Sequence, residues 1–393
     1  MGREFRRQSM PEEARGVFHE ALDKTTLPEV NEEFERQIAR TFGDEQNWNQ
    51  VIRRLQEWKT RYPDSRILPE VNYDLAWYRY QSEEGNALEK FRHFLLDYPD
   101  SAMSLSAGMW IGNSHFQNRN YQKAEEIFKD LCAEPEITFP GAIEACMMAG
   151  RSAFAQRDFE KARDHFQKIV VWVGKQPDFE KDPELFLFRS RAVFAIGDTW
   201  MQDSEVQRNA GSDNFVSGHE LRQSDRFLQA LEHFVAVAES ESTLKLLAWG
   251  RAGDCYHQLG YSIPKRIDDA KNAYRVLIDI PGGMIPEIRF QAKIGYANIL
   301  FEEALLLEDA HQKQEQVNKA LQIYMSILDS NPTESLSDRA QFWAKRAGFT
   351  ALKAAYKAGS QAMLDSICRE LILRIPELTN YLKTKMSEPS KLN

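Results

Sequence analysis

Apolar residues recur along the chain in amphipathic stretches with the three-to-four-residue spacing of α-helices. The stretch 111–131, IGNSHFQNRNYQKAEEIFKDL, shows the pattern most clearly. A small residue is followed nine positions later by an aromatic, and then by a small, a large and an apolar residue at steps of three, four and three: Gly112, Tyr121, Ala124, Phe128 and Leu131. The last four lie on one face of a helix. The stretch therefore predicts two helices joined as a hairpin.

The same signature returns along most of the chain. The next copy lies 38 residues downstream at all five positions: Gly150, Phe159, Ala162, Phe166 and Ile169. Other copies start at Trp48, Glu84, Phe227, Ile267 and Val317, with a weaker copy at Gln361 and a partial one at Ala14. One hairpin cannot bury its apolar face, so repeated hairpins predict a stacked solenoid.

Small residues and prolines indicate how the hairpins are built. Small side chains let two helices approach closely, and they recur in the second helices as Ala87, Ala124, Ala162, Ala230, Ala270 and Ala320, and in the first as Gly112, Gly150, Gly197, Gly253 and Gly295. Proline ends a helix, and five second helices are followed by one: Pro63, Pro99, Pro281, Pro332 and Pro376.

The signature is interrupted at one place above all. From Gly197 to Phe227 the spacing is 30 residues, against nine in the typical hairpin, and the extra residues 202–226 are polar. Insertions in repeat proteins often form loops that bind partners, although a tolerated surface loop has the same composition. The interval from Gly295 to Val317 instead predicts longer helices.

These features divide the chain into five parts. We expect a partial N-terminal repeat or cap at 1–30, a regular array at 31–170 and a polar linker at 171–184. A second array follows at 185–376, with the insertion at 202–226, and a tail occupies 377–393.

Composition narrows the class of protein. Hydrophobic residues make up 42% of the chain and charged residues 28%, which is typical of a globular protein. The net charge of -9 argues against a general nucleic-acid binder, whose affinity comes from neutralising phosphates. No run of 18 apolar residues predicts a membrane span. We find no phosphate-binding loop, nucleophile elbow, zinc motif or calcium loop, so no metal, cofactor or catalytic residue is expected.

The four cysteines, Cys132, Cys146, Cys255 and Cys368, contain no Cys-x-x-Cys pair. We expect buried free thiols. For Cys132 and Cys146 a disulfide is the alternative, because they lie on consecutive helices. Such a bond would favour a cell-envelope compartment.

The repeated signature resembles that of the tetratricopeptide repeat family over residues 30–376. The resemblance implies an all-α, right-handed, open α–α superhelical solenoid of eight to nine hairpins. The closures Tyr-Pro-Asp-Ser at 62–65 and 98–101 resemble bacterial cell-envelope members, namely the periplasmic coordinator of the Tol-Pal system and the outer-membrane assembly lipoprotein.

In this family the first helices line an inner groove. The inward positions that the resemblance implies carry arginine, asparagine, acidic and aromatic residues: Arg79, Tyr80, Asn113, Phe116, Arg151, Phe154, Arg191, Asp198, Asp254, His257, Arg289 and Tyr296. Such a mixture suits an extended peptide or a helix, although an ordinary solvated surface has similar residues. The lysine and asparagine set of members that bind chaperone tails is absent.

We therefore expect a non-enzymatic scaffold that binds a protein or peptide partner through this groove and the insertion. A cytoplasmic adaptor with the same fold is one alternative, and a carbohydrate-active enzyme on an α/α toroid is another. The compartment is the periplasm or cell envelope if the chain is processed or truncated, and the cytoplasm otherwise.

Overall fold

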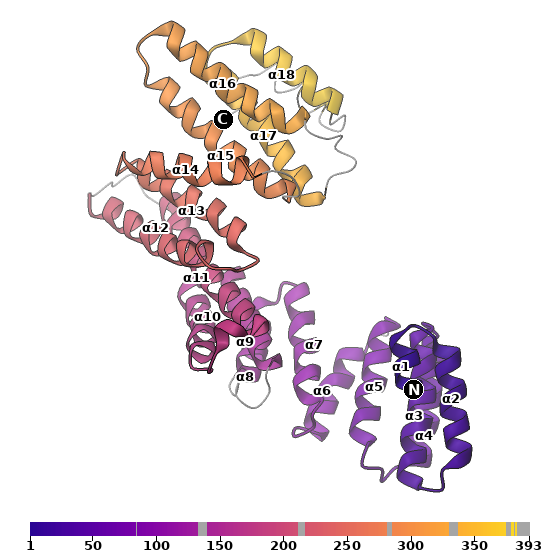
Figure 1. The fold of residues 1–393 in the computed structure, drawn as a ribbon. Coiled ribbons are helices and arrows are strands. Elements are labelled where there is room, and N and C mark those ends of the chain that lie inside the picture. Colours follow the sequence, from indigo (N-terminus) through magenta and orange to yellow (C-terminus); the bar gives the residue numbers. More distant parts are fainter. Residues whose placement is uncertain are drawn as a thin grey trace. The chain divides into compact units, whose positions relative to one another are not determined.

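The computed structural model describes residues 1–83, 85–132, 140–210, 217–280, 285–329, 337–374, 379–380 and 382, without the side chains of 204–210, 217–223 and 374. In these residues the chain forms eighteen α-helices and one short 3-10 helix, and no strand (Figure 1). The chain forms two compact units, Met1–Trp172 and Val173–Asn393.

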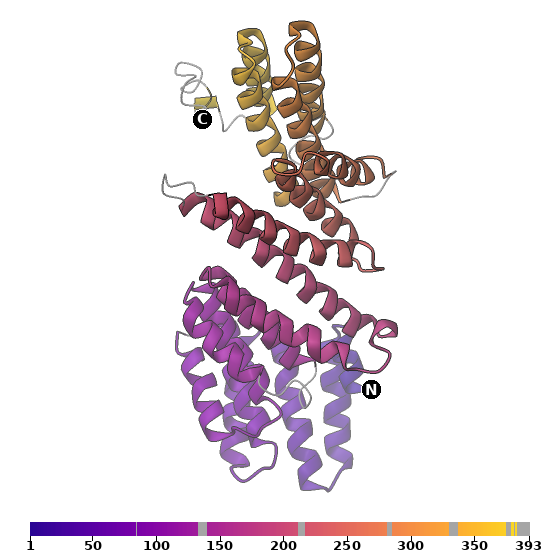
Figure 2. The same cartoon turned by 90° about the vertical axis from the view of Figure 1, so that its left-hand side faces the viewer.

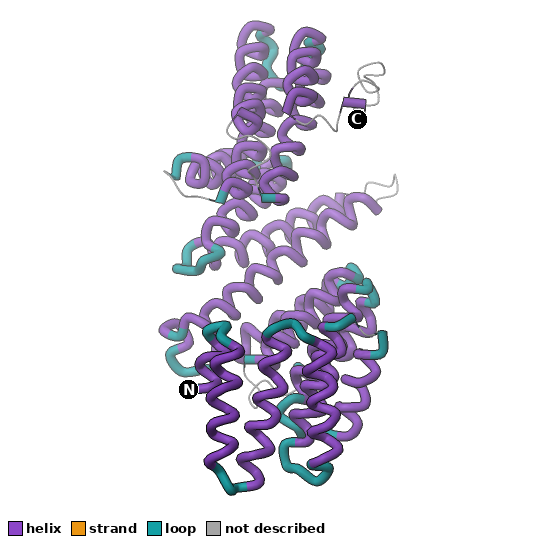
Figure 3. Tube along the Cα trace, turned by 90° about the vertical axis from the view of Figure 1, so that its right-hand side faces the viewer, coloured by secondary structure: helices purple, strands orange, loops and turns teal. Residues whose placement is uncertain are grey.

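The first unit contains consecutive helices that pack each on the next, from α1 to α9 (Figure 3). Their bounds are α1 Gly2–Arg7, α2 Pro11–Lys24, α3 Pro28–Asp44, α4 Trp48–Arg61, α5 Leu68–Gln81, α6 Ala87–Asp97, α7 Ser104–Gln117, α8 Tyr121–Leu131 and α9 Gly141–Ala155. Helix α10, Phe159–Gly174, ends just beyond the boundary between the units.

The second unit continues the pairing (Figure 2). Its elements are η1 Phe179–Lys181, α11 Pro183–Ala210, α12 Ser217–Ala238, α13 Lys245–Gly260, α14 Arg266–Ile278, α15 Pro286–Leu305, α16 Ala310–Asp329, α17 Asp338–Lys357 and α18 Gln361–Arg374. The first helices of successive pairs also contact one another, as α15 contacts both α13 and α17. The predicted all-α solenoid of eight to nine hairpins is confirmed.

The signature residues form the core of each hairpin. The second-helix alanines are all buried, and the large residues four positions later are among the most deeply buried side chains: Phe91, Phe128, Phe166, Phe234, Tyr274 and Tyr324. A Cβ added at Gly112 would lie 2.6 Å from the ring of Phe128, and one at Gly253 would lie 2.6 Å from Tyr274. The glycine of a first helix therefore makes room for the ring of its own second helix.

Gly295 departs from this rule. Its missing side chain makes room for Tyr274, which belongs to the preceding hairpin. One ring thus occupies the space left by two glycines, Gly253 and Gly295, and ties two hairpins together.

The turns inside the hairpins also repeat. Gln46, Glu83, Arg119 and Arg157 each follow a first helix and have φ between 58° and 63°. Residues other than glycine rarely adopt this left-handed backbone conformation, which costs roughly 1–2 kcal/mol. The packing of the two helices must therefore impose it.

The segments in which the sequence departs most from the repeat signature are largely helical. Helix α11 runs to Ala210 and α12 starts at Ser217, so most of the insertion predicted at 202–226 lengthens two helices; residues 211–216 lie outside the described part. Helices α15 and α16 have 20 residues each, which confirms the longer helices predicted after Gly295. The predicted linker at 171–184 contains the end of α10, the helix η1 and the start of α11.

The structure describes only two of the five prolines that were predicted to end helices. Pro63 and Pro99 follow α4 and α6, which end at Arg61 and Asp97. The other three prolines, Pro281, Pro332 and Pro376, lie outside the described residues, as does Glu84.

Two of the four cysteines are paired, so the expectation of four free thiols is wrong. Cys132 caps the end of α8 and Cys146 lies in the second turn of α9; a disulfide joins them, with Cα atoms 4.9 Å apart. The packing of α8 on α9 brings the two residues within the distance that a disulfide requires. Cys255 and Cys368 are buried free thiols, as predicted.

The glycine-to-ring packing predicts opposite effects for two identical substitutions. Gly112→Ala should lower the free energy of unfolding by about 1–3 kcal/mol, because the new methyl group displaces the buried Phe128 ring. Gly16→Ala, in the exposed face of α2 with no atom within 4 Å of the new Cβ, should raise it by about 0.5–1 kcal/mol through helix propensity. Urea unfolding of both variants measures the difference, and equal effects would contradict the packing.

Candidate partner-binding surfaces

The second unit holds a polar network centred on Asp254 of α13. The Asp254 carboxylate accepts hydrogen bonds from the Tyr274 hydroxyl of α14 at 2.7 Å and from the Gln291 amide of α15 at 2.8 Å. The Arg251 guanidinium lies 3.9 Å from Asp254 and 3.3 Å from Asp198 of α11. We call Asp198, Arg251, Asp254, Tyr274 and Gln291 the Asp254 network; it joins three first helices and one second helix.

Charge and burial oppose each other in this network. Burial raises the pKa of Asp198; the Arg251 guanidinium lowers it and the nearby Asp254 carboxylate raises it further. Burial also raises the pKa of Tyr274 well above its ordinary value, and the Asp254 charge adds to that rise. The Tyr274 hydroxyl is therefore a permanent donor at neutral pH. The Asp198 side chain keeps 28% of its surface exposed, so a partner can reach it.

One turn further along α13 lies a second polar contact. The buried His257 ring is 2.9 Å from the Glu302 carboxylate of α15, which also accepts a 3.0 Å hydrogen bond from the Tyr261 hydroxyl. Burial alone would raise the pKa of Glu302, but the contacts with His257 and Tyr261 outweigh it and the pKa is lowered. Asp254, His257 and Tyr261 follow the i, i+3, i+7 spacing of one helix face.

The other predicted groove residues of the second unit lie apart from these contacts. Arg289 donates a 2.6 Å hydrogen bond to the carbonyl of Ile280. The Tyr296 hydroxyl accepts a 2.9 Å bond from Arg275, whose guanidinium also lies 5.4 Å from the centre of that ring. Tyr296 lines a separate pocket between α14, α15 and α16. Arg191, on α11, is exposed.

In the first unit, Tyr80 belongs to a cluster of three half-buried aromatic rings. Its ring centre is 6.1 Å from Trp77 of the same helix and 5.1 Å from Trp110 of α7, and the two tryptophans are 4.5 Å apart. We call Trp77, Tyr80 and Trp110 the aromatic cluster. It joins the first helices of two successive hairpins.

Phe116 and Phe154 face their own hairpins. Their rings stack edge-on against Tyr121 and Phe159, at 5.3 and 5.5 Å between centroids. Both partners are the first residues of the following second helices, α8 and α10. These two phenylalanines therefore stabilise the turn of the hairpin.

Arg79, Asn113 and Arg151 occupy three different settings. Arg79 lines a pocket of about 330 Å³ among residues of α4, α5 and α6, with Lys59 and Lys90. Asn113 is half-buried on α7. Arg151 is exposed on α9 and approaches the sulfur of Met148 at 3.7 Å.

The sequence did not reveal several residues of the Asp254 network and of the neighbouring contact between His257 and Glu302. Arg251, Gln291 and Glu302 were not predicted, although Arg251 lies three residues before Asp254 and so shares its helix face. Gln291 and Glu302 meet α13 only through the stacking of two hairpins, and no local spacing encodes that register.

The described residues contain neither a metal-binding cluster nor a membrane-spanning helix. Within the described residues, no group of three or more histidine, cysteine or acidic side chains could hold a metal ion. Among the helices that the structure describes, none combines the length and apolarity needed to cross a membrane.

Comparison with known proteins identifies the repeat. Residues 111–178 match the model of the tetratricopeptide repeat family. No curated protein sequence matches the chain.

Solved structures resemble the chain only distantly. The C-terminal part of a TPR repeat-containing protein from Cytophaga hutchinsonii is 11% identical, with a TM-score of 0.46 over 71% of this chain and 94% of that chain. The apo form of RapI is 11% identical, with a TM-score of 0.44 over 96% of each chain. Yeast Tom70 is 14% identical, with a TM-score of 0.38 over 92% of this chain and 62% of that chain. Likenesses at this level carry no information on the function of this chain.

The family match falls on α7, α8, α9 and α10, the two hairpins in which the signature is most regular. The likeness to the tetratricopeptide repeat family is therefore shown for residues 111–178, within a solenoid of similar helix pairs.

Proposed function

We propose that the protein is a non-enzymatic scaffold that binds an extended, basic segment of a partner protein along α11, α13 and α15. The observation that supports this proposal is the Asp254 network. Its polar side chains come from three first helices and one second helix of the second unit, and the carboxylates of Asp198 and Asp254 keep 28% and 23% of their surface exposed.

The charge of this face favours a basic partner. Two carboxylates, those of Asp198 and Asp254, accompany one guanidinium, that of Arg251, while Glu302 is paired with His257. A lysine or arginine of the partner would be attracted to the unbalanced negative charge, and backbone N–H groups of an extended segment could donate to the same oxygens. An acidic segment would be repelled.

The first unit offers a different kind of contact. In the aromatic cluster three large rings lie on two neighbouring first helices, and aromatic residues of this kind are the commonest anchors of protein interfaces. The exposed Arg151 and the half-buried Asn113 share the repeat position of Asp254, so we include them in the binding surface of this unit. The insertion at 202–226 is a third proposed contact.

The proposed binding face can be tested with conservative variants. A partner is first identified by affinity capture and mass spectrometry. Its affinity should then fall about tenfold or more for Asp198→Asn or Asp254→Asn, since a charge-assisted hydrogen bond contributes roughly 1.5–3 kcal/mol. Glu232→Gln, an exposed carboxylate on the second helix α12, is the matched control. Isothermal titration that gives wild-type affinity for both aspartate variants would move the binding site elsewhere.

We further propose that the protein works in an oxidising compartment, as in a bacterial cell envelope. The disulfide between Cys132 and Cys146 supports this, because such bonds persist in the periplasm and are rare in the cytosol. The Tyr-Pro-Asp-Ser closures, which resemble those of cell-envelope relatives, point the same way.

The redox state inside cells tests this proposal. Cells that produce the protein are quenched with acid, and free thiols are alkylated under denaturing conditions. The intact mass of the protein is then measured. We expect two alkylated cysteines, Cys255 and Cys368, and four after prior reduction. Four alkylated cysteines without reduction would favour a cytoplasmic adaptor instead.

A further inference from the structure

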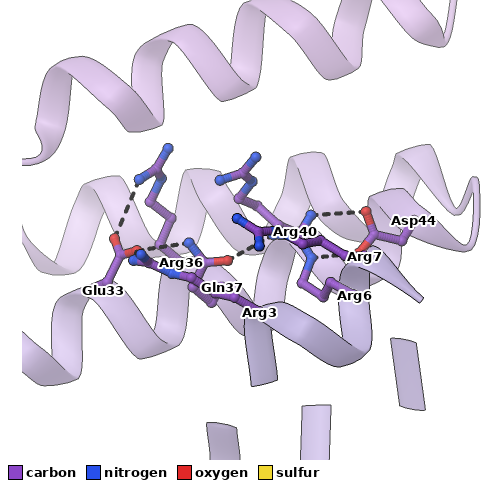
Figure 4. A pocket seen from close by; sticks show the side chains of 8 residues that line it. All are labelled: Arg3, Arg6, Arg7, Glu33, Arg36, Gln37, Arg40 and Asp44. Atoms are coloured by element: carbon purple, nitrogen blue, oxygen red, sulfur yellow. Dashed lines mark hydrogen bonds and ion pairs between the residues drawn. The ribbon is translucent and has the colours of Figure 1, made fainter. Parts of the chain in front are cut away.

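A strongly charged pocket lies at the N-terminal end of the first unit, between α1 and α3. It has a volume of about 500 Å³ and eight lining residues (Figure 4), namely Arg3, Arg6, Arg7, Glu33, Arg36, Gln37, Arg40 and Asp44. Figure 4 shows the side chains of both helices gathered over one another, with Glu33 and Asp44 at opposite ends of the row. We call this the arginine pocket.

Positive charge exceeds negative charge in the arginine pocket. Five arginines line it, against two carboxylates. A third carboxylate, Asp74 of α5, reaches Arg36 at 2.8 Å and Arg40 at 3.7 Å. With Glu4, which meets Arg7 at 3.5 Å, four carboxylates face five arginines, so one positive charge is left over in a chain whose net charge is -9. Guanidinium groups gathered in this way repel one another unless an anion lies among them.

The walls of the pocket are held by their own contacts. Arg6 donates to Asp44 at 2.9 Å and to Gln37 at 2.7 Å, and Arg3 pairs with Glu33 at 2.6 Å. Burial alone would raise the pKa of Glu33, but the hydrogen bond from Gln37 and the arginine charges outweigh it, so that the pKa is lowered. Glu33 therefore stays ionised at neutral pH, and the contacts of Glu33 and Asp44 fix α1 on α3.

Two arginines have donors beyond those contacts. The Nε of Arg40 is buried and makes no hydrogen bond, since Asp74 lies 3.7 Å away, although the same guanidinium is also hydrogen-bonded to Tyr78. A buried donor without an acceptor costs about 1–3 kcal/mol. Arg7 is exposed and meets Glu4, its neighbour on α1, at 3.5 Å. Its guanidinium can turn toward a ligand at little cost.

We propose that the arginine pocket binds a compact, multivalent oxyanion such as phosphate, pyrophosphate or a polycarboxylate. Arginine presents parallel N–H groups that match two oxygens of one such anion. The lining contains no aromatic and no aliphatic residue, so the pocket has no apolar wall on which an acyl chain could pack. The ligand class is therefore a small, fully polar anion.

Binding can be measured on the whole chain by isothermal titration with phosphate, pyrophosphate and citrate, against sodium chloride at equal ionic strength. We expect saturable binding of a phosphate or a polycarboxylate, and the stronger of the two identifies the source of the oxygens. Arg40→Gln and Arg7→Gln should each weaken it about tenfold. Arg53→Gln, an exposed arginine of α4 paired with Glu57, is the matched control and should bind like the wild type.

Circular dichroism melting without ligand shows whether each variant is folded. Arg7→Gln removes an exposed side chain, so it decides the question even if Arg40→Gln fails to fold. The proposal is overturned if none of the three anions binds more tightly than chloride, or if the folded arginine variants bind as tightly as Arg53→Gln.

Discussion

The close approach of a first helix to an aromatic ring of its second helix is the constraint on which this structure depends. At Gly112, Gly150, Gly197 and Gly253 no side chain would fit beside the ring of the same hairpin. Because the glycine and the ring meet at the same repeat position, successive hairpins have a similar internal geometry. Each hairpin therefore presents a similar apolar face to the next. At Gly295 the ring comes from the hairpin before, and the same device then joins two repeats.

This packing also determines which side chains are free to act. Positions next to the ring, such as Phe116 and Phe154, are used inside the hairpin. The position directly after the glycine holds carboxylates at Asp198 and Asp254, which reach the neighbouring first helices through Arg251 and Gln291. Asp254 also accepts a hydrogen bond from the hydroxyl of Tyr274, so the polar network is attached to the ring that fills the hairpin.

The sequence predicted the architecture well because each hairpin is a local structure. Every copy of the signature falls in a second helix where those residues are described, from Trp48 in α4 to Gln361 in α18. Only one member of the aromatic cluster, Tyr80, and two of the Asp254 network, Asp198 and Asp254, were predicted as site residues. Their other members come from neighbouring hairpins, so they depend on how one hairpin is rotated on the next. The disulfide was left open for the same reason, since it depends on the packing of α8 against α9.

The partner is proposed to bind the first helices of the second unit. Hydrogen–deuterium exchange of the chain with and without its captured partner shows directly which helices the partner covers. Slower exchange of peptides from α11, α13 and α15, with little change in α12, α14 and α16, is the result that the Asp254 network predicts. Protection confined to the second helices, or to the first unit alone, would contradict it.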